Sequence, residues 1–225
     1  MIVKAPILIP VKGYSKRCHK KNYALLPYTA EYIHEQGMTD AAVVITDSVE
    51  LMELAKSLGL NFHIEVREPN QDELYSCWNF VRTNNIDLFF LCPVTQPFKS
   101  VNLINKMMQL FQDEKKWDFI TTVSAVQDRH IFFVQKVLDG YRFKYTCKNR
   151  KGNDCQTEFM IDGVLYLIRT SFLKSIINAV NSNETFWQGK FTCIKNETPF
   201  MDIDTQDDIR QFDFLKQYFK KYCAY

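Results

Sequence analysis

Short apolar runs alternate with amphipathic stretches through the first half of the chain. Runs rich in Val, Ile and Leu are typical of buried strands and predict them at residues 3–9 and 41–46, and further short strands are expected at residues 62–64, 87–91 and 119–123. Helical spacing with cap and glycine signals predicts helices at residues 27–36, 48–58, 72–82 and 100–113. Pro10 is expected to end the first strand, and Ser48 and Ser100 are expected to cap their helices. This alternation indicates an α/β fold with a doubly wound, mostly parallel sheet flanked by helices.

The pattern changes after Ser124. Residues 131–137 and 141–145 flank the turn sequence Asp139-Gly140, which predicts a β-hairpin. We interpret residues 125–160 as an insertion into a single domain that spans residues 1–225. A core strand is expected again at residues 163–168, followed by a helix from Ser171. The last helix is expected at residues 206–222, where an apolar stripe at helical spacing packs on the sheet.

Composition narrows the classes of function. The chain has 225 residues, 46% of them hydrophobic, which suffices for one sizeable core. Its formal net charge of +2 gives no overall reason to expect nucleic-acid or membrane binding. The 7 cysteines form no Cys-x-x-Cys pair, which disfavours a disulfide framework or a zinc site. No signal peptide or membrane-spanning run is recognisable, so we expect a cytoplasmic protein with reduced thiols.

Positive charge is concentrated between the first strand and the first helix. Residues 10–22, called the basic segment below, contain no acidic residue and carry Lys12, Lys16, Arg17, Lys20 and Lys21. Such a segment repels itself unless an anion neutralises it, and a polyphosphate is the obvious candidate. Gly13 is expected to adopt a positive φ and to let the backbone approach this ligand. The alternative is a solvated loop or a patch for nucleic acid or membrane, and the small net charge disfavours the patch.

A pair of carboxylates precedes the last helix. Asp202 and Asp204 flank Ile203, so on an extended backbone both carboxylates point to one side of the chain. Two carboxylates on one side repel each other unless a cation lies between them, and magnesium commonly takes one or two carboxylates together with substrate phosphates. The alternative is that Asp204 or Thr205 is only the N-cap of the helix. In combination with a phosphate-binding segment in the same sheet, the metal site is the favoured interpretation.

Other polar residues follow predicted strands, at the edge where open α/β sheets bind ligands. Thr46-Asp47-Ser48 ends the second strand, although Ser48 is also a typical helix cap. Arg67 follows the third strand and suits a phosphate or a ribose, with an ordinary surface arginine as an equal alternative. The two prolines within residues 93–99 predict a rigid loop beside the substrate.

These motifs together resemble the acylneuraminate cytidylyltransferases, or CMP-sialic acid synthetases. The first motif of that family, Ile-Pro-Ala-Arg-Gly-Gly-Ser-Lys with a later Lys-Asn, is similar to residues 9–16 and Lys21-Asn22. The Ser-Lys and Lys-Asn pairs distinguish it from the related Kdo cytidylyltransferases. In the same order along the chain follow segments similar to later family motifs: residues 46–50, Arg67 with Asp72, residues 95–99, residues 162–166 and residues 201–208.

The resemblance implies a Rossmann-like, GT-A-like nucleotidyltransferase fold in a homodimer, with the inserted hairpin reaching the partner. It implies magnesium-dependent transfer of CMP from CTP to the anomeric hydroxyl of a sialic-acid-like nonulosonic acid, with release of pyrophosphate and no nucleic-acid or membrane partner. Catalytic roles would fall to Lys12, Lys16, Lys21 and Asp204. The nucleotide would be bound by Lys12, Gly13, Ser15, Lys16, Lys21, Asn22, Arg67 and Asp72. The acceptor would be bound by Thr95, Gln96, Gln156 and Asp162, and the metal by Asp202 and Asp204.

The chain departs from the family pattern mainly on the acceptor side. Lys12 replaces an arginine, Tyr14 a glycine and Asp162 an asparagine. The arginine expected to hold the carboxylate of the acid is not identifiable, and its possible substitutes are Lys148, Arg150 and Lys151. An unusual nonulosonic acid is one interpretation. Two other functions stay open: a nucleotide-sugar-dependent glycosyltransferase, and a non-catalytic nucleotide-binding protein derived from a transferase.

Overall fold

The structure is a computed structural model that describes residues 5–15, 17–68, 70–114, 116–125, 132–137, 140–145, 159–179 and 182–222. Its strands are β1 (Ile7–Val11), β2 (Ala42–Thr46), β3 (Asn61–Ile64), β4 (Leu88–Leu91), β5 (Phe119–Ala125), β6 (Phe132–Val137), β7 (Gly140–Tyr145), β8 (Phe159–Arg169) and β9 (Phe191–Lys195). Its helices are α1 (Lys21–Glu35), the 3₁₀ turn η1 (Thr39–Ala41), α2 (Val49–Ser57), α3 (Glu73–Thr83), α4 (Leu103–Asp113), α5 (Thr170–Ile176), α6 (Ser182–Phe186) and α7 (Gln206–Tyr222).

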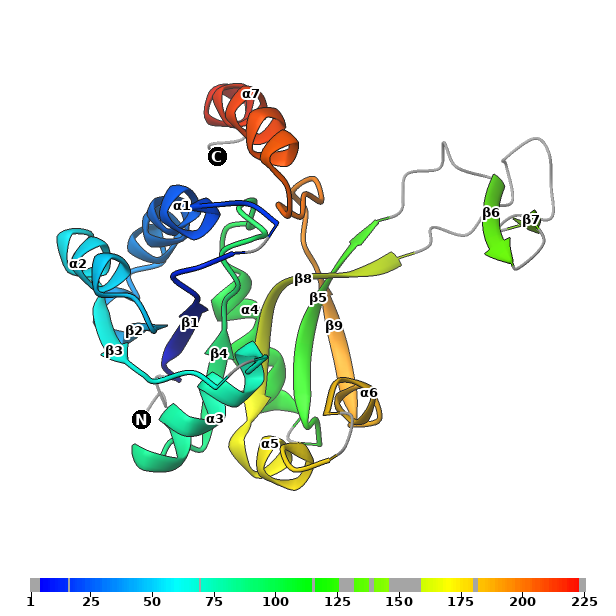
Figure 1. Cartoon of the computed structure of the whole chain (residues 1–225). Coiled ribbons are helices and arrows are strands. Elements are labelled where there is room, and N and C mark those ends of the chain that lie inside the picture. The colour runs from blue at the N-terminus through cyan, green and yellow to red at the C-terminus, as the bar shows by residue number, and fades with distance from the viewer. Residues whose placement is uncertain are drawn as a thin grey trace.

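One 7-stranded sheet forms the centre of the molecule, in the order β3-β2-β1-β4-β8-β5-β9 (Figure 1). Its neighbouring strands pair in parallel except at β8, which runs antiparallel to both β4 and β5. The predicted α/β class with a mostly parallel sheet is therefore confirmed. β6 and β7 form a separate antiparallel pair, which confirms the predicted hairpin, while its role in dimerisation stays a prediction.

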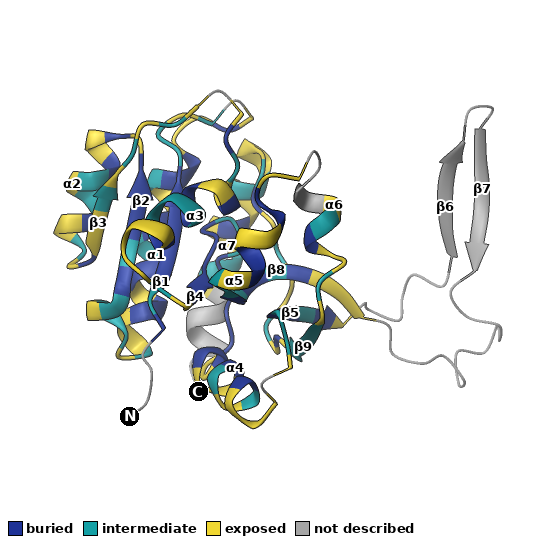
Figure 2. Ribbon diagram, turned by 90° about the horizontal axis from the view of Figure 1, so that it is seen from below, coloured by how far each residue is buried: buried dark blue, intermediate teal, exposed yellow. Residues whose placement is uncertain are grey.

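Helices cover both faces of the sheet, because side chains alternate along each strand. Ile7 and Ile9 of β1 belong to the cluster that includes side chains of α1, α2, α4 and α7, whereas Leu8 belongs to the cluster with α3, α5 and α6. Figure 2 shows the buried residues concentrated in the strands and the inward sides of these helices. The three-layer arrangement leaves the carboxyl ends of the parallel strands accessible for a ligand site.

The beginning of the chain differs from the prediction at two prolines. Pro10 does not end β1. The missing N–H of Pro10 lies on the β4 side of β1, and the pairing with β4 already ends at Leu8 and Leu91, so no ladder hydrogen bond is lost. The first helix begins at Lys21 rather than at Pro27, which lies inside α1. Lys21 and Asn22 of the basic segment are thus the first residues of a helix.

Ser100 does not cap α4. The residue before α4 is Asn102, whose φ is 65° and whose side chain makes no capping hydrogen bond. Ser100 instead donates a hydrogen bond from Oγ to Asn196 Oδ1 at 2.6 Å, which ties the loop before α4 to the segment after β9. The predicted Ser48 cap is confirmed, since Ser48 Oγ accepts from Leu51 N at 3.3 Å.

Other sequence expectations can be compared with the described residues. Cys18, Cys77, Cys92 and Cys193 are free thiols, as expected. In α7, Phe212 is buried, as the predicted apolar stripe requires, and Ile209 packs partly buried against the same cluster. None of the described helices has the length and apolar character needed to cross a membrane.

Candidate functional site

Three chain segments meet at the carboxyl edge of the sheet. β1 is flanked by β2 on one side and β4 on the other, so the crevice beyond β1 and β4 is a topological switch point. The basic segment follows β1, and the loop of residues 92–100 follows β4. Ile203 N donates to Thr95 O at 2.9 Å, which brings the Asp202-Ile203-Asp204 sequence to the same edge.

Lys21 joins the two ends of the chain. Its side chain is only 9% exposed, and its Nζ donates to Asp204 Oδ1 at 2.9 Å and to Ile203 O at 3.0 Å. Arg17 Nη1 contacts the other oxygen, Asp204 Oδ2, at 2.7 Å. The basic segment is therefore not simply a solvated loop, because a buried lysine of this segment is fixed to the predicted metal ligand.

Asp204 is not the N-cap of α7. Thr205 and Asp208 cap this helix reciprocally: Asp208 N donates to Thr205 Oγ1 at 3.2 Å, and Thr205 N donates to Asp208 Oδ2 at 2.7 Å. Asp204 N also donates to Asp208 Oδ2, at 3.0 Å, and this hydrogen bond, with those that Thr205 Oγ1 and Thr205 N donate to the same carboxylate, lowers the pKa of Asp208. The carboxylate of Asp204 is thus left for Lys21, Arg17 and a ligand.

Asp202 lies one step away on the same extended segment. Ile203 between the two acids is fully buried, whereas Asp202 is exposed, as the predicted alternation requires. Gln96 Nε2 donates to Asp202 Oδ1 at 2.9 Å. Desolvation by the surrounding protein atoms raises the pKa of Asp202, and the charge of Asp204 adds to this rise.

The donor set suits the predicted magnesium ion. No cluster of three or more His, Cys, Asp or Glu side chains is arranged for a metal in the described part of the chain. Magnesium, however, takes one or two protein carboxylates and completes its shell with water and substrate phosphates. Asp202 and Asp204 are two such carboxylates, Asp204 also contacts Lys21 and Arg17, and the magnesium ion stays a prediction.

Gly13 is needed for close packing rather than for a special backbone conformation. Its φ is not positive, contrary to the prediction. A Cβ at this position would lie 2.6 Å from Ser48 Cβ, and Gly13 N donates to Asp47 Oδ1 at 2.7 Å. The Thr46-Asp47-Ser48 sequence therefore anchors the basic segment from β2. Tyr14, which also has no positive φ, is 68% exposed and leaves the segment uncrowded.

The start of α1 shapes the rest of the basic segment. Asn22 Nδ2 donates to Lys12 O at 2.7 Å, and Ser15 Oγ accepts from Cys18 N at 3.4 Å. No side chain caps α1, and its first turn contains no acidic residue. The partial positive charge of this helix end therefore adds to the positive charge of the segment. Lys16 lies outside the described residues.

Arg67 is buried, which excludes the surface-arginine interpretation. Its Nε contacts Glu65 Oε1 at 2.6 Å, and the two side chains are 4% and 6% exposed. Gln71 Nε2 donates to the second oxygen of Glu65 at 3.1 Å. Nη1 and Nη2 of Arg67 have no hydrogen-bond partner among the described residues. The arginine is thus held by its Nε, and its two buried outer nitrogen atoms have no partner among the described residues.

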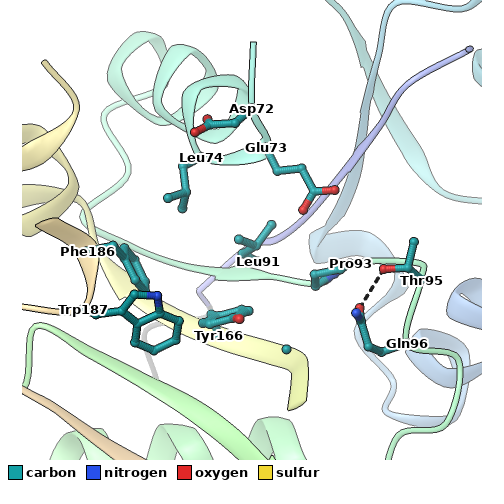
Figure 3. A pocket seen from close by; sticks show the side chains of 11 residues that line it. Asp72, Glu73, Leu74, Leu91, Pro93, Thr95, Gln96, Tyr166, Phe186 and Trp187 are labelled. Carbon is teal, nitrogen blue, oxygen red and sulfur yellow. Dashed lines mark hydrogen bonds between the residues drawn. The ribbon is translucent and has the colours of Figure 1, made fainter. Parts of the chain in front are cut away.

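A cavity of about 320 Å³ opens beside the start of α3, and we call it the α3 cavity. One part of its lining consists of Thr95 and Gln96 (Figure 3). The remainder includes the acids Asp72 and Glu73 and the aromatic residues Tyr166, Phe186 and Trp187. The predicted acceptor residues Thr95 and Gln96 thus share one cavity with Asp72, which also caps α3 by accepting from Tyr75 N at 2.8 Å.

Glu73 and the aromatic residues of the cavity were not predicted. An acid in the first turn of a helix is explained by the helix dipole alone, and aromatic residues such as Trp187 more often fill a core or an interface than bind a ligand. Glu73 is exposed by surface area, but the protein atoms around its carboxyl group desolvate it and raise its pKa, and the charges of Arg67, Lys12 and Lys21 partly offset this rise. Glu73 is therefore close to both the cavity and the cationic groups.

Asp162 lies beneath the site. It is 3% exposed, and its carboxylate accepts hydrogen bonds from Thr122 Oγ1, from Ser124 Oγ at 2.8 Å and from Val164 N at 3.1 Å. The next residue, Gly163, has a φ of +67° and lines the α3 cavity. Asp162 thus fixes the bend of β8 at the cavity. The prediction that it binds substrate stays untested, and Gln156, Lys148, Arg150 and Lys151 lie outside the described residues.

Comparison with known proteins supports both the sequence resemblance and the fold. No protein-family model matches the chain. Over 135 residues the chain is 27% identical to the N-acylneuraminate cytidylyltransferase of Escherichia coli O18:K1:H7 (strain RS218 / NMEC), a match that covers 55% of this chain and 32% of that protein. The chain thus spans about a third of the length of this curated relative. The resemblance found from the motifs is confirmed to this extent.

Solved structures show the same fold at low sequence identity. CMP:2-keto-3-deoxy-manno-octonic acid synthetase complexed with CTP superposes with a TM-score of 0.72 at 12% identity, over 96% of this chain and 99% of the other. A cytidylyltransferase from Leptospira borgpetersenii serovar Hardjo-bovis (strain JB197) superposes with a TM-score of 0.67 at 17% identity, over 96% of this chain and 87% of the other. The predicted Rossmann-like nucleotidyltransferase fold is confirmed.

Proposed function

We propose that this protein transfers CMP from CTP to a hydroxyl group of a sialic-acid-like nonulosonic acid and releases pyrophosphate. One observation carries the proposal: the buried Lys21 of the basic segment donates hydrogen bonds to Asp204 and to the backbone of Ile203 at the carboxyl edge of the sheet. A cationic phosphate-binding segment and a pair of metal-binding carboxylates are the two parts that nucleotidyl transfer requires, and they come from opposite ends of the chain.

The triphosphate would lie against the basic segment. Lys12, Arg17 and Lys21 supply positive charge there, and the uncapped start of α1 supplies backbone donors. Gly13 keeps the segment close to β2, and Asn22 fixes the carbonyl of Lys12. These contacts set the positions of the charges before a ligand arrives, which reduces the reorganisation needed during reaction.

In the reaction, an acceptor hydroxyl oxygen attacks the α-phosphorus of CTP while its proton is released to solvent. A new phosphorus–oxygen bond forms, the bond between the α-phosphorus and the bridging oxygen breaks, and pyrophosphate leaves with the electron pair of that bond. Lys21 and Lys12 stabilise the negative charge that develops on the phosphoryl and leaving oxygens. Magnesium held by Asp202 and Asp204 would neutralise further charge on the phosphates. Gln96, which holds Asp202, would link this metal site to the acceptor in the α3 cavity.

The proposal includes a homodimer. Phe159, Met160 and Ile161 at the beginning of β8 are 52%, 39% and 39% exposed, and they lie where the segment that contains the hairpin rejoins the sheet. Consecutive exposed apolar residues are typical of an interface. Light scattering of the wild type and of Ile161→Lys tests this part: the wild type should have the mass of a dimer and the variant that of a monomer. A monomeric wild type would contradict it.

The main test measures pyrophosphate release with magnesium, a panel of nucleoside triphosphates and several nonulosonic acids. CTP together with at least one acid should give pyrophosphate, and Lys21→Met should lower this rate by about 100-fold or more. Lys56→Met is the matched control, because Lys56 is an exposed lysine on α2 away from the site. CTP binding without turnover would indicate a non-catalytic nucleotide-binding protein, and consumption of a nucleotide sugar would indicate a glycosyltransferase. Either result would overturn the proposal.

A further inference from the structure

The α3 cavity combines carboxylates with aromatic rings. Figure 3 shows Asp72 and Glu73 at the start of α3 on one side, and Tyr166, Phe186 and Trp187 on another. None of the described residues that line this cavity is Lys, Arg or His. The cationic side chains of the site lie outside this lining: Arg17 and Lys21 contact Asp204, and Arg67 is held by Glu65.

The rings form a corner rather than a flat stack. Phe186 and Trp187 are inclined at 87° with ring centroids 5.3 Å apart, and Tyr166 and Phe186 at 79° with centroids 6.0 Å apart. Phe186 is buried, whereas Trp187 is 39% exposed. The face of an aromatic ring attracts a positively charged group through its quadrupole.

The charged side chains that line the cavity beside these rings are the acids Asp72 and Glu73. Burial raises the pKa of Tyr166 to about 12, and the charges of Asp162, Glu73 and Asp202 add to this rise. No donor from the described part of the chain makes a hydrogen bond to the carboxylate of Glu73. An additional carboxylate in this cavity would be repelled, whereas a cation would compensate Glu73.

We propose that the α3 cavity binds a cationic substituent of the acceptor, such as a protonated amine, between the carboxylates of Asp72 and Glu73 and the rings of Tyr166 and Trp187. This inference rests on the proposed function, and it specifies the class of acceptor: a sugar acid that carries a free amine or another cationic nitrogen. The carboxylate of such an acid lies outside this cavity. The cavity therefore selects acceptors by their cationic nitrogen and not by the carboxylate that all sugar acids share.

A binding experiment tests the cation preference without turnover. Choline and its uncharged isostere 3,3-dimethyl-1-butanol are titrated into the full chain while the indole N–H signal of Trp187 is followed by NMR. Choline should shift this signal and bind about tenfold or more tightly than the alcohol. Glu73→Gln should weaken choline binding by about tenfold and leave the alcohol unchanged. Glu68→Gln, which removes the same charge from an exposed residue in the loop before α3, should change neither.

Equal affinities for the two probes, or a choline shift that Glu73→Gln leaves unchanged, would overturn the inference. A turnover experiment then relates the cavity to the reaction. Two nonulosonic acids that differ only in bearing a free amine or an acetamido group are compared as acceptors with CTP. The amine should have the higher kcat/KM, and Glu73→Gln should remove this preference through KM. Cation binding without any pyrophosphate release would contradict the proposed function alone, and turnover with a preference for the acetamido compound would contradict the cationic acceptor alone.

Discussion

Replacing Asp204 and Asp208 separately distinguishes the two roles that an acidic sequence before a helix can have. Asp204→Asn removes a charge that holds Lys21 and Arg17, whereas Asp208→Ala removes the cap of α7. If Asp204 belongs to a catalytic metal site, Asp204→Asn should lower activity far more than stability. Asp208→Ala should show the opposite pattern.

The structure sets the expected magnitudes. Arg17 is 69% exposed, so its ion pair with Asp204 contributes about 0.5 kcal/mol or less to stability. Asn keeps an oxygen for the hydrogen bond from the buried Lys21, and the lost charge weakens that bond by about 1 kcal/mol. Asp204→Asn should therefore cost about 1 kcal/mol of stability and about 100-fold or more in kcat. Loss of the Asp208 cap should cost about 1–2 kcal/mol of stability and at most a few-fold in kcat.

Urea unfolding gives the free energy of unfolding of each variant, and pyrophosphate release at a temperature well below unfolding gives kcat per folded molecule. The reasoning would be refuted if Asp204→Asn retained the kcat of the wild type. It would also be refuted if the two variants lost activity and stability in the same proportion, because Asp204 would then act only in folding.

Three further predictions concern the surroundings of the site. Gly13→Ala should weaken CTP binding in calorimetry by about tenfold, because its Cβ would lie 2.6 Å from Ser48 Cβ and the basic segment would have to move; unchanged binding would show that the segment tolerates the shift. Asp162→Ala should lower the urea-derived stability by about 3 kcal/mol, since it leaves the hydroxyls of Thr122 and Ser124 without their buried acceptor; a loss below about 1 kcal/mol would contradict this. The pKa of Glu73 is raised in the folded state, so the native protein holds this proton to higher pH than the unfolded chain. The free energy of unfolding of the wild type, relative to that of Glu73→Gln, should therefore fall as the pH rises above the ordinary pKa of glutamate. Urea unfolding from pH 4 to pH 8 measures this relative stability, and an increase of it with pH would contradict the assignment.

The strands were predictable because each one is encoded locally. The apolar runs of β2, β3, β4 and β5 have no competing helical period, and the predicted ranges agree with the structure to within two residues at each end. The direction of β8 was not predictable in this way, because it depends on how the chain returns after the insertion. The start of α1 was also missed: Lys20, with a φ of 59°, precedes it and no capping side chain marks it.

Part of the site followed from the sequence, and part required the fold. The alternation of side chains along residues 202–204 correctly predicted a buried Ile203 between two acids that point outward, because this alternation requires only an extended backbone. The capping role of Thr205 and Asp208 had a sequence signal, since a threonine followed three residues later by an acid is typical of a capping box. The contact of Lys21 with Asp204 and the position of Glu73 depend on tertiary packing, so no local pattern indicates them.

The central claim is that the basic segment and the Asp202-Ile203-Asp204 sequence together transfer the α-phosphoryl group of CTP. Phosphorus NMR of the protein with CTP, magnesium and a nonulosonic acid tests it most directly. The account predicts that the CTP signals are replaced by one phosphodiester signal and by pyrophosphate in equal molar amounts, and that Asp204→Asn slows this conversion by about 100-fold. Unchanged CTP, or the release of inorganic phosphate with formation of CDP, would contradict the claim.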